Sequence, residues 1–248
     1  GLPTLVGVDR LLVREVRSEA STQAVQTEAL LESFLKQRIA MLNGLRAQVA
    51  TSRSQREAAT RFSTLGRELL RESPVLFALY LLDASGRVVH LDRGGPANFE
   101  ESGLDHAHFA GRGRAIAVAR TRRAPASTGS IRLVSGARGM VTYVPVVREG
   151  EVAGFVGGAI DYQALFSDAL AGQLQGRFGY RISDAGGEPI AVSPDYPASA
   201  SRTIQPTVSL PGELGWRLEV AIPPFEPLVP RLFTWLIGLA LLAALALL

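Results

Sequence analysis

Residues 140–161, MVTYVPVVREGEVAGFVGGAID, contain the pattern that decides the fold. Residues 140–147 and 152–160 are two apolar segments, rich in Val, that are typical of strands. The segment Arg148-Glu149-Gly150 between them is expected to form a tight turn. We therefore predict that the two strands form an antiparallel pair.

On the N-terminal side of this pair, the pattern predicts a helix and further strands. Asp105 is expected to cap a helix that ends near Arg120, and the small residues 124–129 are expected to form a turn-like segment. Apolar segments predict strands at residues 75–82, 88–91 and 131–134, the first two joined by a turn at residues 83–86. Two strands, a helix and three antiparallel strands follow the element order of a PAS- or Cache-like sensor fold.

The first 73 residues have a helical pattern. Between about residues 11 and 49 apolar side chains recur at steps of three and four, at Leu31, Phe34, Leu35, Leu42, Leu45 and Val49. A continuous helix over this segment would be about 60 Å long. We interpret it as a stalk that rises from a membrane, or as one partner of a coiled coil. A second helix is expected over residues 55–71, with Ser73-Pro74 ending it.

The C-terminal part predicts a second, smaller subdomain and a membrane segment. Asp161 is expected to cap a helix over residues 162–175, and a hairpin turn is expected at residues 184–188. Four strands are expected, at residues 180–183, 190–193, 207–210 and 216–222. Residues 232–248 carry no charge and are predicted to enter a bilayer, because a helix of that length spans about 25 Å. A buried core helix is the alternative for this segment.

The predicted fold class is therefore α+β, in five parts. They are N-terminal stalk helices (1–73), a distal PAS-like subdomain with an antiparallel sheet (74–160), a connecting helix with the proximal subdomain (161–222), a Pro-rich connector (223–231) and an incomplete transmembrane helix (232–248). The apolar start, residues 2–8, fits the end of an earlier membrane helix or of a signal segment.

Composition and motifs argue against several classes of function. The formal net charge is only +3, which is a small basic excess for a nucleic-acid-binding protein. The sequence has no Cys and no Gly-x-Ser-x-Gly, Walker-type or His-Glu-x-x-His motif. Asp105, His106 and His108 are a weak metal cluster, and we interpret both His residues as part of a solvated first turn. We expect no catalytic site, metal or cofactor.

Three segments resemble the CHASE family of extracytoplasmic sensor domains of receptor kinases and cyclases. They are residues 119–133, ARTRRAPASTGSIRL, residues 139–147, GMVTYVPVV, and residues 154–161, GFVGGAID. The resemblance implies a stalk helix, a distal ligand-binding subdomain, a smaller proximal one, and a bacterial inner-membrane protein whose main domain lies in the periplasm or outside the cell. In cytokinin-binding members an acidic pocket residue pairs with adenine, whereas this sequence has no Asp or Glu between His106 and Arg148.

We assign the candidate ligand-binding site to the distal subdomain. Its members are Tyr80, Thr128, Arg132, Tyr143 and Gly157. Tyrosine suits recognition because an aromatic body carries a polar tip, and glycine lets a ligand approach the strand backbone. Satisfied core tyrosines and a close-packed glycine are the alternatives.

The acid-free segment carries eight arginines and forms a local positive field. We assign five of them, Arg112, Arg114, Arg120, Arg122 and Arg123, to a surface for an anion or a partner. A small anionic ligand, anionic headgroups or an acidic partner protein would fit this charge. A solvated surface neutralised by acids from elsewhere in the chain is the alternative.

Two functions follow from these patterns. The first is a membrane-anchored, non-catalytic sensor module, whose C-terminal helix lies in membrane lipid and whose ligand is a small anion. The second is an accessory subunit of a larger membrane complex, for example a photosynthetic or respiratory assembly, that uses the same fold as a periplasmic docking surface. Other membrane subunits or a second copy of the chain are the expected protein partners.

Overall fold

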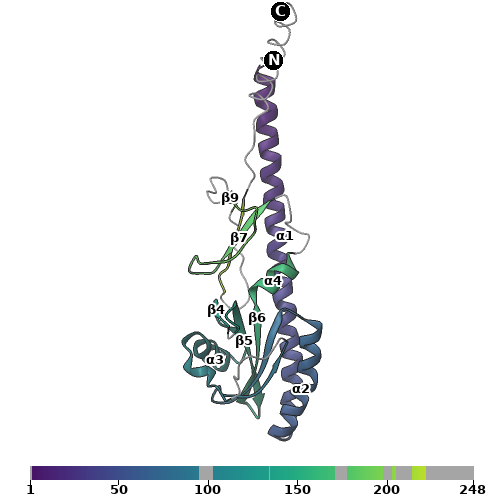
Figure 1. Ribbon diagram of the computed structural model, residues 1–248, viewed down its shortest axis with the longest axis vertical. Helices are drawn as coiled ribbons and strands as arrows, with labels where there is room; N and C mark the ends of the chain where they lie inside the picture. Colours follow the sequence, from purple (N-terminus) through teal and green to yellow (C-terminus); the bar gives the residue numbers. More distant parts are fainter. Residues whose placement is uncertain are drawn as a thin grey trace, which may run out of the picture.

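The computed structural model describes residues 2–94, 103–133, 135–170, 178–197, 203–204 and 214–221. Figure 1 shows one helix, α1 (Leu2–Ala50), running along the length of the molecule with two sheets beside it. The predicted α+β class, with a long N-terminal helix and antiparallel sheets, is confirmed.

Helix α1 buries one stripe of side chains between Ala20 and Val49. The buried apolar members of the stripe are Ala20, Ala24, Leu31, Leu35, Leu42, Leu45 and Val49. Steps of three and four residues place side chains on one helix face, so this stripe is the signal that predicted the helix. Because α1 contacts both sheets, it is their common support.

Helix α2 (Gln55–Glu72) lies beside the C-terminal end of α1 (Figure 1). Its N-cap is Ser54, whose hydroxyl accepts a hydrogen bond from the backbone N–H of Glu57. The carboxylate of Glu57 accepts in return from the backbone N–H of Arg53 at 2.8 Å. This reciprocal capping starts a new helix only four residues after α1 ends.

The first sheet has six antiparallel strands in the order β2-β1-β6-β5-β3, with β4 also pairing with β5. The strands are β1 (Leu76–Asp83), β2 (Val88–Arg93), β3 (Ala126–Ser127), β4 (Ile131–Arg132), β5 (Arg138–Arg148) and β6 (Glu151–Asp161). The predicted antiparallel pair is β5 and β6. Glu149 and Gly150 join them with φ of 50° and 84°, the left-handed conformation that a two-residue hairpin turn requires.

Helices cover both faces of this sheet. Along β1, Leu79 and Leu81 pack in the cluster that contains the α1 and α2 side chains. The alternate residues Ala78, Tyr80 and Leu82 pack in a second cluster with α3 (Ala110–Arg122). In Figure 1, α3 lies on the opposite side of the sheet from α1 and α2. The period of two along each strand thus separates two cores.

The second sheet has the order β8-β7-β10-β9. Its strands are β7 (Gly179–Ser183), β8 (Pro189–Val192), β9 (Thr203–Ile204) and β10 (Arg217–Ala221). Helix α4 (Tyr162–Ala169) leads into it and starts at the predicted cap, Asp161, which accepts from the N–H of Ala164 at 3.1 Å. Arg138 of the first sheet donates to the carbonyl of Pro189 at 3.0 Å and so links the two sheets.

Some expectations differ from the structure or fall outside it. Asp105 caps a single 3₁₀ turn, η1 (His106–His108), and α3 begins only at Ala110. The segment expected to be turn-like contains β3, and β9 was not expected. The predicted strand 207–210, the connector 223–231 and the membrane helix 232–248 lie outside the described residues. Among the helices that are described, none has a stretch apolar enough to cross a bilayer.

We expect Gly158→Val to destabilise the fold by about 1–3 kcal/mol, because it overpacks the contact between α1 and β6. A Cβ atom on Gly158 would lie 2.8 Å from Leu42 Cδ2. Urea unfolding followed by circular dichroism measures the effect. As a control, Gly44→Ala on α1 meets no atom within 4 Å and should stabilise the helix, by about 1 kcal/mol. An unchanged midpoint for Gly158→Val would show that α1 does not pack this closely on the sheet.

Candidate ligand-binding site

Three of the predicted pocket residues lie in one row across the first sheet. Gly157 of β6 pairs with Tyr80 of β1 on one side and with Tyr143 of β5 on the other. Both tyrosines are buried on the α3 side of the sheet. A Cβ atom on Gly157 would lie 3.3 Å from Tyr80 and 3.4 Å from Tyr143. Glycine therefore leaves room for the two rings to lie side by side.

His106 covers this row from the α3 side and is fully buried, with 0% of its surface exposed. Its ring centroid lies 4.8 Å from that of Tyr80 in an edge-on arrangement. Its Nδ1 lies 2.9 Å from the hydroxyl oxygen of Tyr143. The expectation that His106 belongs to a solvated turn was wrong, because η1 turns this side chain inward over the tyrosines.

His108, in the same turn, points into solvent as expected. Its Nδ1 lies 2.9 Å from a carboxylate oxygen of Asp105, and 84% of the side chain is exposed. Asp105 also accepts from the backbone N–H of Ala107 at 3.0 Å, which fixes the turn. In the part of the chain that the structure describes, no three His, Asp or Glu side chains come close enough to hold a metal ion.

Arg112 determines the proton arrangement of His106. One terminal nitrogen of the guanidinium lies 3.0 Å from Nε2 of the imidazole. Because arginine can only donate, Nε2 accepts, and the neutral ring carries its proton on Nδ1 and donates it to the Tyr143 oxygen. Burial, and secondly the Arg112 charge, lower the pKa of His106 to about 3. The ring is therefore neutral at physiological pH.

Arg112 does not belong to an exposed basic surface, which corrects the sequence expectation. Only 6% of this residue is exposed. Its guanidinium lies 5.4 Å from the ring centroid of Phe109 and faces His106. The sequence places Arg112 on α3, but only the tertiary structure shows that this helix turns it toward the sheet.

A hollow of about 290 Å³, which we call the α3–β3 hollow, lies beside the tyrosine row. Ala115 and Ala126 line it and also pack in the same cluster as Tyr80 and Tyr143. One wall is a single face of α3, and the other is the segment that leads through β3. The lining residues are Ala110, Gly111, Arg114, Ala115, Val118, Arg122, Pro125, Ala126, Ser127, Thr128, Gly129 and Leu214.

The polar groups of the α3–β3 hollow suit an anion. Arg114 and Arg122 lie on the α3 wall, and none of the described lining residues is acidic. Thr128, on the opposite wall, accepts from the backbone N–H of Val141 at 3.0 Å, so its hydroxyl proton is available to donate. Three predicted site residues thus come together here, although they had been assigned to two different surfaces.

The other predicted arginines lie elsewhere. Arg120 donates to the carbonyl oxygen of Ala84 at 2.6 Å, which ties α3 to the turn after β1. Arg123 is exposed at the C-terminal end of α3. Arg132 is exposed on β4, opposite Arg138 in the ladder. None of these three lines the α3–β3 hollow.

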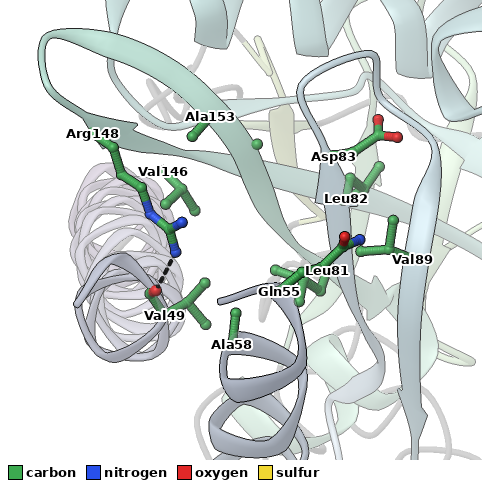
Figure 2. Close-up of a pocket in the computed structure, with 11 residues that line it drawn as sticks. Val49, Gln55, Ala58, Leu81, Leu82, Asp83, Val89, Val146, Arg148 and Ala153 are labelled. Atoms are coloured by element: carbon green, nitrogen blue, oxygen red, sulfur yellow. Dashed lines mark hydrogen bonds between the residues drawn. The ribbon is translucent and has the colours of Figure 1, made fainter. Parts of the chain in front are cut away.

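A second hollow, of about 230 Å³, lies where the C-terminal end of α1 and the start of α2 meet the first sheet. Figure 2 shows its lining residues, which include Val49, Ala58, Leu81, Asp83 and Arg148. We call it the α1–α2 hollow. Sequence analysis missed it because its walls come from six helices and strands, α1, α2, β1, β2, β5 and β6, none of which carries a recognisable motif.

Comparison with a family model and with solved structures identifies the type of fold. The CHASE domain family model matches residues 96–192, the region that carries α3 and every lining residue of the α3–β3 hollow except Leu214. This match agrees with the resemblance found in the sequence. Among curated proteins, none matches this chain.

Several solved ligand-binding domains of receptors have the same fold. An extracellular ligand-binding receptor from Desulfohalobium retbaense is 16% identical with a TM-score of 0.61, over 82% of this chain and 40% of that one, so this chain spans less than half of that receptor. An amino acid chemoreceptor domain of Pseudomonas aeruginosa, in complex with GABA, is 20% identical with a TM-score of 0.58. The match covers 79% of this chain and 96% of that domain. A Campylobacter jejuni chemoreceptor domain, in complex with L-valine, is 12% identical with a TM-score of 0.63. The match covers 86% of this chain and 94% of that domain. These neighbours show a Cache-type fold.

The neutral His106 predicts acid-sensitive stability. An unfolded chain takes up the imidazole proton near the ordinary pKa of 6.5, whereas the folded chain takes it up only near pH 3. The contribution of His106 to the free energy of unfolding should therefore be complete above the pKa of the unfolded chain. Below that pKa the free energy of unfolding should fall as the pH drops, by up to about 1.4 kcal/mol per pH unit. Urea unfolding between about pH 5 and pH 7 measures this slope. His106→Gln should reduce it, and the exposed His108→Gln should not. Equal slopes in the two variants would contradict the buried assignment.

Proposed function

We propose that this chain is the extracytoplasmic ligand-binding part of a membrane-anchored sensor and that it has no catalytic activity. The fold supports this proposal because the similar solved structures are receptor ligand-binding domains rather than enzymes. The anchor would be the uncharged residues 232–248, which would place the main domain in the bacterial periplasm.

The ligand that fits best is a small anion in the α3–β3 hollow. The observation that carries this proposal is the pairing of Arg114 and Arg122 on one wall with the Thr128 hydroxyl on the other, and with no described acidic lining residue. Guanidinium groups bind carboxylate and phosphate oxygens through charge-assisted hydrogen bonds. The apolar lining residues Ala115 and Val118 would contact the rest of the ligand.

The tyrosine row itself is an unsuitable place for the ligand, since protein side chains fill it. Tyr80, Tyr143 and His106 are each at most 1% exposed. We propose instead that the row supports the hollow beside it. The hydrogen bonds from Arg112 through His106 to Tyr143 would hold η1 and the first turn of α3 against the sheet.

A second candidate function is an accessory subunit of a larger membrane complex. The filled tyrosine row favours it, because a fold that needs no ligand can fill this space with its own side chains. The exposed guanidinium groups of Arg114, Arg122 and Arg123 would then contact an acidic partner protein. Exposed arginine side chains would suit a surface that binds a partner protein as well as a site that binds a small ligand.

The sensor proposal is tested by titrating the full chain, purified in mild detergent, with acetate, succinate and inorganic phosphate. We expect saturable binding by calorimetry to at least one of these anions. Arg114→Gln and Arg122→Gln should each weaken it by at least about tenfold, because each removes a charge-assisted hydrogen bond.

Arg132→Gln is the matched control, since it removes an exposed arginine of the same segment that does not line the hollow. It should leave the affinity unchanged. Equal losses in all three variants would indicate a diffuse positive field instead of a site. Absence of binding, together with co-purification of other membrane subunits in a fixed ratio, would favour the accessory subunit.

A further inference from the structure

The α1–α2 hollow has walls that suit a short hydrocarbon chain. Ala58 of α2, Leu81 of β1 and Val146 of β5 line it and are each about 95% or more buried. Val49, in the last turn of α1, and Val89 of β2 complete this apolar lining. Its volume of about 230 Å³ suits a ligand of only a few heavy atoms.

Arg148 supplies a positive charge at one side of the hollow. One terminal nitrogen, Nη2, donates to the carbonyl oxygen of Val49 at 2.9 Å, which holds the guanidinium against the end of α1 (Figure 2). Within the described residues this is the hydrogen bond that the guanidinium makes, and its Nε is buried without a partner. The charge is therefore only partly compensated by the protein. Arginine only donates, so the complementary group is an anionic acceptor, for which a carboxylate is well shaped.

Asp83 limits the charge that the hollow accepts. In Figure 2 it lies on the opposite side of the hollow from Arg148. Its Oδ1 accepts from the backbone N–H groups of Ser85, Gly86 and Arg87, which fixes the carboxylate in the turn after β1. A second carboxylate on the ligand would be repelled by this fixed negative charge. One anionic group is therefore favoured over two.

We propose that the α1–α2 hollow binds a small aliphatic monocarboxylate. The carboxylate lies at Arg148, and the apolar chain lies against Ala58, Leu81 and Val146. This site is separate from the α3–β3 hollow and shares no lining residue with it, so the proposal does not rest on the sensor function argued above.

The test uses the full chain in mild detergent with ¹³C-labelled methyl groups of Val and Leu. Propionate, butyrate, valerate and hexanoate are the probes, with glutarate as the dicarboxylate and 1-pentanol as the neutral comparison. Valerate should shift the methyl signals of Val49, Val89 and Val146 saturably and leave Val118, in the other hollow, unshifted. Affinity should rise about fourfold with each added methylene until the hollow is full. Glutarate and 1-pentanol should bind at least about tenfold more weakly than valerate.

Two variants distinguish a loss of valerate binding from a loss of folding. Arg148→Lys keeps a positive donor for the end of α1 but lacks the planar guanidinium, and should weaken valerate binding by about tenfold. Ala58→Leu occupies the hollow without touching Arg148 and should also abolish the methyl shifts. Unfolding midpoints near that of the native chain would show that both variants remain folded.

Arg114→Gln, in the α3–β3 hollow, is the matched control and should leave valerate binding unchanged. Unchanged valerate binding by this variant would show that the present proposal and the sensor proposal can fail independently. The absence of methyl shifts for all four monocarboxylates at about 10 mM would overturn the proposal, since a dissociation constant above that level is too weak for a specific site. Native-like binding by folded Arg148→Lys or Ala58→Leu would also overturn it.

Discussion

Strands β1, β6 and β5 are covered on both faces, so nearly every side chain along them needs an apolar neighbour. A sheet of this kind folds only if amphipathic elements cover both of its faces. The chain supplies α1 and α2 for one face and α3 for the other. Gly158 of β6 lets Leu42 of α1 pack closely on the strand backbone. This close contact helps to fix the position of α1 on the first sheet.

The same constraint explains why the two hollows lie at the margins of the first sheet. The middle of its α3 face is filled by Tyr80, Tyr143 and His106, and both ring nitrogens of His106 are paired, one with Tyr143 and one with Arg112. Burying such groups is favourable only with their hydrogen bonds formed, so this arrangement resists the entry of a ligand. Space remains where helix and sheet diverge, beside β3 on one side and at the junction of α1 with α2 on the other.

Much of the fold could be predicted from sequence because its signals are local. The apolar stripe from Leu31 to Val49 predicted α1, and the Glu149-Gly150 turn predicted the pairing of β5 with β6. Adjacent strands also bring Tyr80, Gly157 and Tyr143 together once their pairing is known. His106 was misplaced because it lies between Asp105 and His108 in a short turn, whereas its neighbours in space are the two tyrosines. The α1–α2 hollow could not be predicted, since it is lined by segments far apart in the chain. The α3–β3 hollow is lined almost entirely by residues 110–129, but its shape depends on how β3 folds back beside α3, which a linear pattern does not show.

The two hollows contact different parts of the framework, which matters for how a bound molecule could change the protein. An occupant of the α1–α2 hollow lies against Val49, in the last turn of the long helix. An occupant of the α3–β3 hollow lies against Leu214, three residues before β10 of the second sheet begins. A ligand changes a conformational equilibrium only by binding two states unequally. If such ligands bind, the first hollow would couple to the position of α1 on the sheet, and the second to the relation between the two sheets. Because α1 contacts β5, β6, β9 and β10, a shift of either sheet would be felt at this helix.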